Sequence, residues 1–180
     1  MRWFSESDAD SPREDAATSS HGTTALEPPP SSSARLARIV EGAKGGFVAT
    51  LVMTGYRLPI SHALPPTALF WSKFVAGGDP NDHPIPGLVL HLLYGTVAGA
   101  AFGATAPERH AREVTESELA GLFWGTLYGL ALSAVGERVL LNELLDLTLD
   151  SDERLVFHVG HLIYGLTLGT WLGSRTGDER

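Results

Sequence analysis

Residues 91–103 read His-Leu-Leu-Tyr-Gly-Thr-Val-Ala-Gly-Ala-Ala-Phe-Gly, and this stretch decides the fold. Three glycines stand four residues apart in an apolar run, with one histidine at its head. Seventy positions later, residues 161–173 read His-Leu-Ile-Tyr-Gly-Leu-Thr-Leu-Gly-Thr-Trp-Leu-Gly and repeat the histidine, the Tyr-Gly pair and all three glycines. Residues four apart share one face of a helix, and small residues there let two helices approach closely in lipid. The pattern predicts closely packed membrane helices.

The amino-acid composition limits which partners and which reactions the protein can have. The chain has 180 residues, a net charge of -8 and no cysteine. No disulfide, thiolate metal site or thiol nucleophile can therefore form. A nucleic-acid partner is not expected, because no basic stripe is present to contact phosphates. Two lysines stand against eleven arginines. This acidic, lysine-poor composition resembles that of proteins from halophilic archaea, although GC-rich coding would also favour arginine.

The first 34 residues differ from the rest of the chain. They are rich in Ser, Asp, Glu, Thr and Pro and contain almost no apolar residues. Such a segment cannot bury enough apolar surface to offset the entropy of ordering, so residues 1–34 are predicted to form a disordered acidic tail. They lack the positive end and apolar core of a secretory signal. The membrane domain is predicted over residues 35–175.

Four apolar stretches predict membrane spans at about residues 39–58, 85–106, 119–141 and 155–174, since a span needs about 20 mostly apolar residues. The predicted fold class is therefore all-α, a polytopic four-helix membrane bundle. The second span is the clearest because it carries no charge. The first is the weakest: Glu41 and Lys44 lie near its start, where they can pair, and Arg57 at its end can extend to the interface.

Two connections carry apolar residues of their own. Residues 66–76 lie between Pro65-Pro66 and Gly77-Gly78, which are helix start and stop signals. The aromatic residues of this segment fall on one side, which predicts a helix lying flat at the interface; a short helix packed over the bundle is the alternative. The leucines of the acidic connection 143–153 suggest a second short interfacial segment.

Basic residues near the spans predict the orientation through the positive-inside rule. One side has Arg35, Arg38, Lys44, Arg109, Arg112, Arg175 and Arg180, and the other has Arg57, Lys73, Arg138 and Arg154. The protein is thus predicted to be a multi-pass protein of the cell membrane with both termini in the cytoplasm.

Every span carries small residues at four-residue spacing. The predicted helix-packing glycines are Gly95, Gly99, Gly103, Gly121, Gly125, Gly129, Gly165, Gly169 and Gly173, and the first span adds Gly42 and Gly46. They predict a tight glycine-zipper bundle, with a homo-oligomer through unused glycine faces as a further expectation. The match between the second and fourth spans suggests two tandem helical hairpins. Convergence on a good packing sequence is the alternative.

These features together resemble a known group. Residues 42–54 read Gly-x-x-Gly-Gly-Phe-Val-Ala-Thr-Leu-Val-Met-Thr, and Leu-Pro-Pro follows at residues 64–66. With the two histidine-headed stretches, the chain is similar to small prokaryotic four-helix membrane proteins of unknown function, some of them grouped loosely with the YagU type. The resemblance covers about residues 40–173. It implies a four-helix membrane fold and brings no assigned reaction.

The histidines are the candidate functional residues. His91 and His161 each lie two turns into a span, level with each other, and His158 lies one turn nearer the outside. Both His91 and His161 are candidates for cofactor binding, and His158 joins them as a candidate metal ligand, since imidazole binds Zn, Cu, Ni and haem iron. Three interpretations stay open: hydrogen bonds that order the bundle, a metal or haem site, and a proton relay. The expected cofactor is none, with haem or a transition metal as the alternative.

No catalytic residues are predicted, and the protein is not expected to be an enzyme. Ser133, Glu137 and Arg138 form the one other polar grouping, with Glu137 and Arg138 expected to be an interfacial ion pair. The sequence has no phosphate loop, no His-Glu-x-x-His and no Gly-x-Ser-x-Gly. The predicted function is a structural, accessory or stress-related component of the lipid bilayer. The alternatives are a small transporter or channel lined by histidines and tyrosines, and a haem- or metal-binding redox protein.

Overall fold

The computed structural model describes residues 31–60, 65–106 and 114–175. Within these ranges all regular structure is helical and no strand occurs, which confirms the all-α prediction. The predicted tail lies outside the described residues, except for its end. There the boundary at residue 34 is corrected, because the first helix, α1, begins at Ser32. Ser31 caps it, with the Ala34 N–H donating to Ser31 Oγ at 3.3 Å.

Four long helical segments and several short ones make up the fold. Prolines start the short and long helices between residues 66 and 84, since their fixed φ suits the first turn. The segment after Pro66 ends at Gly77, whose φ of 71° favours glycine. In chain order the elements are α1 Ser32–Arg57, α2 Pro66–Trp71, the π-helix η1 Ser72–Ala76, the 3-10 helix η2 Pro80–Asp82, α3 Pro84–Thr105, α4 Val114–Val135, the π-helix η3 Gly136–Leu144 and α5 Ser151–Arg175.

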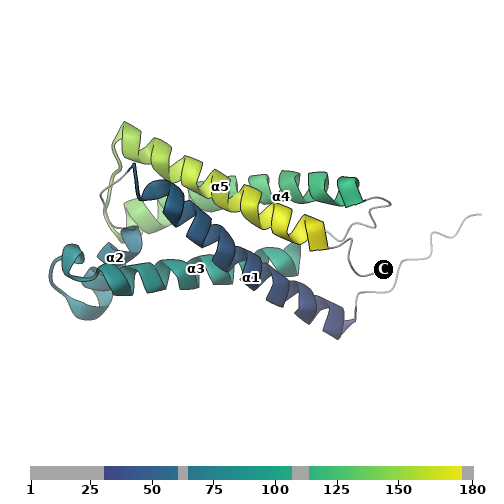
Figure 1. Ribbon diagram of the computed structural model, residues 1–180. Helices are drawn as coiled ribbons and strands as arrows, with labels where there is room; N and C mark the ends of the chain where they lie inside the picture. Colours follow the sequence, from purple (N-terminus) through teal and green to yellow (C-terminus); the bar gives the residue numbers. More distant parts are fainter. Residues whose placement is uncertain (1–30, 61–64, 107–113, 176–180) are drawn as a thin grey trace, which may run out of the picture.

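The long helices form two antiparallel hairpins. α1 packs along α3, α4 packs along α5, and α1 packs against α5 to join the hairpins. Figure 1 shows the start of α1 and the end of α5 at one end of the bundle, called here the terminal end. The connection that carries α2 and the turn into α5 lie at the opposite end, called here the loop end.

Glycines bring the backbones of α1 and α3 into direct contact. A Cβ added to Gly46 would lie 2.8 Å from Gly99 Cα, and one added to Gly99 would lie 2.6 Å from Gly46 Cα. Real Cβ atoms do not approach so closely, so no larger residue fits at this crossing. One turn along, a Cβ on Gly95 would lie 3.0 Å from Thr50 Cβ. Contacts of this kind favour helix association in lipid through van der Waals packing.

The second hairpin repeats this arrangement. A Cβ on Gly125 would lie 2.7 Å from Gly169 Cα, and one on Gly165 would lie 3.0 Å from Gly129 Cα. Gly121 faces Gly169 and Gly173 in the same antiparallel order in which Gly42 faces Gly99 and Gly103. Both hairpins therefore place their glycine faces against each other in the same register.

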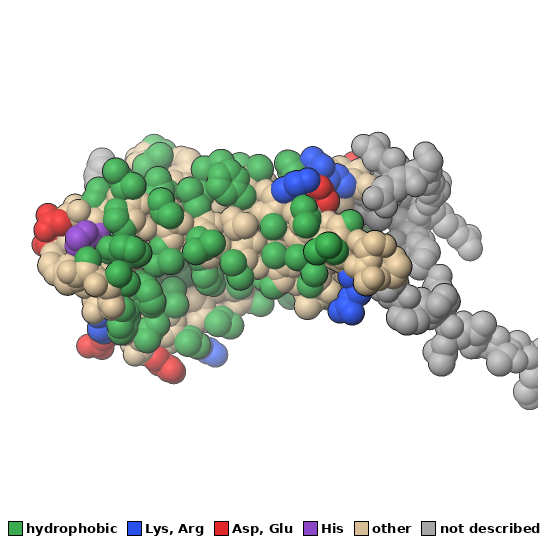
Figure 2. All heavy atoms as spheres, turned by 90° about the horizontal axis from the view of Figure 1, so that it is seen from below, with side chains coloured by type: hydrophobic (Ala, Val, Ile, Leu, Met, Phe, Trp, Pro, Cys, Tyr) green, Lys and Arg blue, Asp and Glu red, His purple; other side chains and the backbone are tan. Residues whose placement is uncertain are grey.

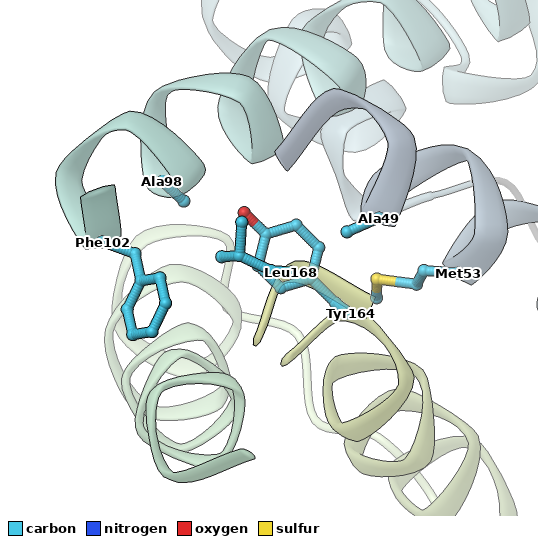
Figure 3. Packing of buried hydrophobic residues seen from close by; sticks show 6 residues of the cluster. All are labelled: Ala49, Met53, Ala98, Phe102, Tyr164 and Leu168. Atoms are coloured by element: carbon cyan, nitrogen blue, oxygen red, sulfur yellow. The ribbon is translucent and has the colours of Figure 1, made fainter. Parts of the chain in front are cut away.

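Where the hairpins meet, larger side chains fill the interior. Figure 3 shows Tyr164 and Leu168 of α5 pointing between α1 and α3, toward Ala49 and Met53 of α1 and Ala98 and Phe102 of α3.

A second buried cluster lies near the loop end and consists of Leu141, Leu145, Leu149 and Phe157. The expected interfacial segment at residues 143–153 is thus corrected: residues 146–150 are not helical, and their neighbouring leucines turn inward onto Phe157.

The surface has the pattern of a membrane protein. Figure 2 shows hydrophobic side chains over the middle of one face and charged side chains toward its two ends. In the part of the chain that the structure describes, three helical segments are long and apolar enough to cross a membrane: Pro84–Thr105, Glu118–Leu144 and Ser151–Arg175. α1 is not among them; its sequence carries Arg35, Arg38, Glu41, Lys44 and Arg57.

Glu41, Lys44 and Arg175 form a cluster of ion pairs at the terminal end. The predicted pair between Glu41 and Lys44 is confirmed, with Glu41 Oε1 2.7 Å from Lys44 Nζ. Glu41 Oε2 also lies 3.0 Å from Nη1 of Arg175, whose guanidinium stands 4.1 Å above the ring of Trp171. Glu41 therefore ties α1 to the last turn of α5.

Substitution of single glycines tests the packing of the hairpins. We expect Gly99→Leu to destabilise the detergent-solubilised protein by about 1–3 kcal/mol or more, because the added side chain must displace the α1 backbone. Gly55→Leu is the control, since a Cβ at Gly55 would meet nothing within 4 Å. Thermal unfolding and size-exclusion profiles of both variants provide the measurement. Equal stability of Gly99→Leu and the parent would contradict the close contact.

Candidate functional site

Polar and ionisable side chains gather near the loop end of the bundle. α4 continues there into the π-helix η3, which begins at Gly136. A π-helix places side chains at a different angle from an α-helix, and such segments are frequent at functional sites. A Cβ on Gly136 would lie 3.2 Å from the Phe157 ring, so a small residue is needed where η3 passes α5. This junction brings the polar residues of α4 and η3 beside those of α5.

Four residues form a hydrogen-bonded chain between these helices. Ser133 Oγ and His158 Nδ1 are hydrogen-bonded, and His158 Nε2 lies 3.1 Å from Glu137 Oε2. Glu137 Oε1 in turn lies 2.8 Å from Nε of Arg154. Ser133 and Glu137 are four residues apart, as are Arg154 and His158, so each pair shares one face of its helix. In neutral His158, Nε2–H donates to Glu137 while Nδ1 accepts from the Ser133 hydroxyl.

This chain corrects the expected pair between Glu137 and Arg138. Consecutive residues on a helix point in different directions, so they do not face each other. Arg138 is exposed, whereas Glu137 faces α5 and binds Arg154 and His158. The predicted grouping of Ser133 with Glu137 is present, and the structure adds His158 between them. The matching four-residue spacings on two antiparallel helices were the signal that could have shown this arrangement.

His161 is buried, with 7% of its surface exposed. Its Nδ1 lies 2.9 Å from the carbonyl oxygen of Phe157, one turn earlier in α5. The imidazole also packs on the Phe157 ring, with 4.4 Å between the two centroids. Because a carbonyl oxygen only accepts, Nδ1 carries the proton, and Nε2 of neutral His161 carries a lone pair.

His91 occupies in α3 the repeat position that His161 occupies in α5. The two histidines are near enough to interact electrostatically, and His91 also interacts with Arg57. Arg57 likewise influences His161. Sequence reasoning placed the guanidinium of Arg57 at the interface, but in the structure its Nε atom is buried. Arg57 is thus a member of this site that the sequence did not indicate.

Tyrosines connect the two hairpins below the histidines. The Tyr164 hydroxyl of α5 donates to the Gly95 carbonyl of α3 at 2.7 Å, and the Tyr128 hydroxyl of α4 donates to the Ala98 carbonyl at 2.7 Å. Tyr94 is near enough to both hydroxyls for electrostatic interaction. Tyr164 is 3% exposed and Tyr94 39% exposed, so the two repeats use the same residue differently.

The side chains that could ligate a metal are spread over several hydrogen-bonded pairs. Among the described residues, no three His, Asp or Glu side chains converge on one point. His158 is already bonded on both ring nitrogens. Among the three candidate histidines, Nε2 of His161 and the ring of His91 are therefore the nitrogens that could ligate a metal. Ser133 faces an imidazole with a carboxylate behind it, yet it is 1% exposed and lies between helices. His83 bonds elsewhere, with its Nε2 atom 2.9 Å from the Gly77 carbonyl oxygen. His62 lies outside the described residues.

The tyrosine bonds give a direct test of how the site is held. We expect Tyr164→Phe to lower the free energy of unfolding by about 0.5–1.5 kcal/mol, because the Gly95 carbonyl loses a buried donor. Tyr94→Phe changes the same atom at the more exposed position of the repeat and should cost less. Thermal unfolding of both variants in one detergent compares them. A larger loss for Tyr94→Phe would contradict the assigned roles.

Comparison of the chain with models of protein families, with curated proteins and with solved structures found no match.

Proposed function

We propose that the protein is a four-span membrane protein whose glycine-packed bundle serves as a structural, accessory or stress-related component of the cell membrane. Both termini are assigned to the cytoplasm. In the sequence, seven Arg and Lys residues flank the spans on the side of the termini, against four on the side of the loop end, and this excess supports the orientation through the positive-inside rule.

The assignment of α1 as the fourth span rests on its surroundings. It packs along α3 and against α5, which are both long and apolar enough to cross a membrane. Its outward side carries Phe47, Leu51 and Val52, each more than 40% exposed, and lipid would cover them. Arg35, Arg38 and Arg57 lie toward the two ends of the helix. Glu41 and Lys44 lie near its middle, where they pair with each other and Glu41 also pairs with Arg175 at the end of α5.

The structural role is carried by one observation: the polar side chains inside the bundle join helices to one another. Tyr164 and Tyr128 donate to carbonyls of α3, and His158 connects Ser133 and Glu137 across α4, η3 and α5. Polar side chains in lipid are costly unless satisfied, and bonds between helices satisfy them while fixing the packing. These groups are therefore accounted for by assembly of the bundle.

A small transporter or channel is the second candidate. It is favoured by the proximity of His91, His161 and Arg57 near the loop end, and by the three tyrosines deeper in the bundle. Ionisable groups at membrane depth mark ion or proton routes in many membrane proteins. In this reading the histidines and tyrosines would line a polar path.

A haem protein, with the haem held by His91 and His161, is the third candidate. The absorption spectrum and the metal content of the purified protein test it.

Labelling of single cysteines tests the four-span topology without background, because the chain has no cysteine of its own. We expect Asn81→Cys and Asp152→Cys, at the loop end, to react with a membrane-impermeant maleimide in intact cells. Ser33→Cys and Ser174→Cys, at the terminal end, should react only after permeabilisation. If Ser33→Cys reacted from the same side as Asn81→Cys, α1 would not cross the membrane.

Flux measurements separate the structural role from transport. Proteoliposomes containing the parent protein and a pH-sensitive dye should acidify no faster than empty liposomes, because a bundle with a purely structural role conducts no protons. His91→Ala proteoliposomes should behave identically. A proton flux in the parent that disappears in His91→Ala would overturn the structural role and support the second candidate.

A further inference from the structure

Arg57 presents a buried donor that the described residues do not satisfy. Its Nε atom is inaccessible to solvent and has no hydrogen-bond partner among them. Leaving a buried donor without a partner costs about 1–3 kcal/mol, and more for a charged group. Native proteins therefore satisfy nearly all such groups with protein atoms, water or ions. We therefore expect a partner outside the described residues to supply an acceptor to the Nε–H of Arg57.

The contacts of α1 show what lies around this guanidinium. Thr50 of α1 touches Gly95 of α3, and Met53 of α1 touches Gly160 of α5, where a Cβ would lie 3.1 Å from Met53 Cε. Arg57 follows Met53 by four residues, so it lies on the same face of α1, one turn nearer the loop end. It therefore stands between the first turns of α3 and α5.

Two histidines lie in the neighbouring turns of those helices. His91 is one turn before Gly95 in α3, so it shares the face of α3 that meets α1, and His161 is adjacent to Gly160 in α5. The electrostatic interaction of each histidine with Arg57, and of the two histidines with each other, agrees with this placement. Among the described residues, the acid that interacts with Arg57 is Glu153, an exposed residue in the first turn of α5. The helix register thus places one permanent cation and two titratable side chains toward the loop end, where α1, α3 and α5 pack together.

We propose that Arg57, His91 and His161 form a binding site for an anionic oxygen group, either a lipid phosphate or a free oxyanion. Guanidinium and imidazolium N–H groups are strong donors to such oxygens. His91 lies about 10 Å from the start of α3 by the helical rise, a depth that a headgroup at the loop-end surface or an ion from solution must reach. Binding of an anion at this site does not depend on whether the bundle has a structural role or transports ions.

The hydrogen bond of His161 gives the site a pH dependence. Because Nδ1–H is held by the Phe157 carbonyl, neutral His161 presents a lone pair at Nε2, which repels an anion. Protonation of Nε2 converts it into a donor, so binding of the anion takes up a proton. The other charged or titratable groups near His161 are Arg57 of α1, His91 of α3 and His158 of α5, with Glu137 of η3 beyond His158. Uptake of one proton weakens binding by up to about tenfold per unit of rising pH.

Isothermal titration calorimetry of the purified full chain in neutral detergent tests the site. Sulfate is the first probe because its charge does not change between pH 6 and pH 8, and phosphatidylglycerol in nanodiscs, against phosphatidylcholine, is the second. We expect saturable binding of at least one probe, at least tenfold tighter at pH 6 than at pH 8. Sulfate binding alone identifies a free oxyanion, and phosphatidylglycerol binding alone identifies a lipid headgroup. Absence of binding by both probes would overturn the proposal.

Matched variants separate the site from general charge attraction. Arg57→Gln should lose at least tenfold in affinity, whereas Arg138→Gln, an equal change of charge at an exposed position of the same end, should bind as the parent does. Equal losses in the two variants would contradict a specific site. His161→Gln can still donate to the Phe157 carbonyl but cannot take up a proton, so its affinity should vary much less with pH. If Arg57→Gln does not fold, His161→Gln decides the test. An affinity of His161→Gln that varies with pH as much as that of the parent would overturn the role of His161.

Discussion

The structure depends on the contact of helix backbones at glycine. At Gly46 against Gly99, and at Gly125 against Gly169, no atom larger than hydrogen can stand between the chains. Such contacts replace the hydrophobic gain that drives helix packing in water but is missing in lipid. They also fix the register of each hairpin, because a shift by one residue would bring a Cβ against a backbone. Large side chains in the interior must therefore lie at the ends of the bundle or between the hairpins.

This restriction explains where the polar residues are found. Ser133, His158 and Glu137 meet beyond the last close glycine contact of α4 with α5, where η3 opens the helix. Tyr128 and Tyr164 occupy the space between hairpins and use the carbonyls of α3 as acceptors. A carbonyl within a helix can accept a second hydrogen bond, so these ties satisfy the tyrosines without breaking the helix.

Much of the fold could be predicted from the sequence. Apolar stretches of sufficient length and glycines at four-residue spacing define helices and their faces. The four-residue spacings of Ser133 with Glu137 and of Arg154 with His158 also mark the faces that meet. The pairing of these side chains and the neighbours of Arg57 could not be predicted in the same way. They depend on how far each hairpin is rotated about its axis and on the change from α- to π-helix at Gly136, and neither leaves a periodic signal. Leu145 and Leu149 were misjudged for a related reason: in a connection, apolar residues suit an interface and a core equally well.

The four sides of the bundle are not alike. Backbone contacts or closely packed helices close the sides between α1 and α3, between α4 and α5, and between α1 and α5. Among the described residues, α3 and α4 are joined by side chains instead, through the rings of Phe102 and Tyr128 at 4.9 Å and the bond from Tyr128 to the Ala98 carbonyl. Side-chain contacts can rearrange one residue at a time, whereas interlocked backbones must separate as a whole. The interface between α3 and α4 is thus the one that can separate most easily, and sideways opening of the bundle would begin there.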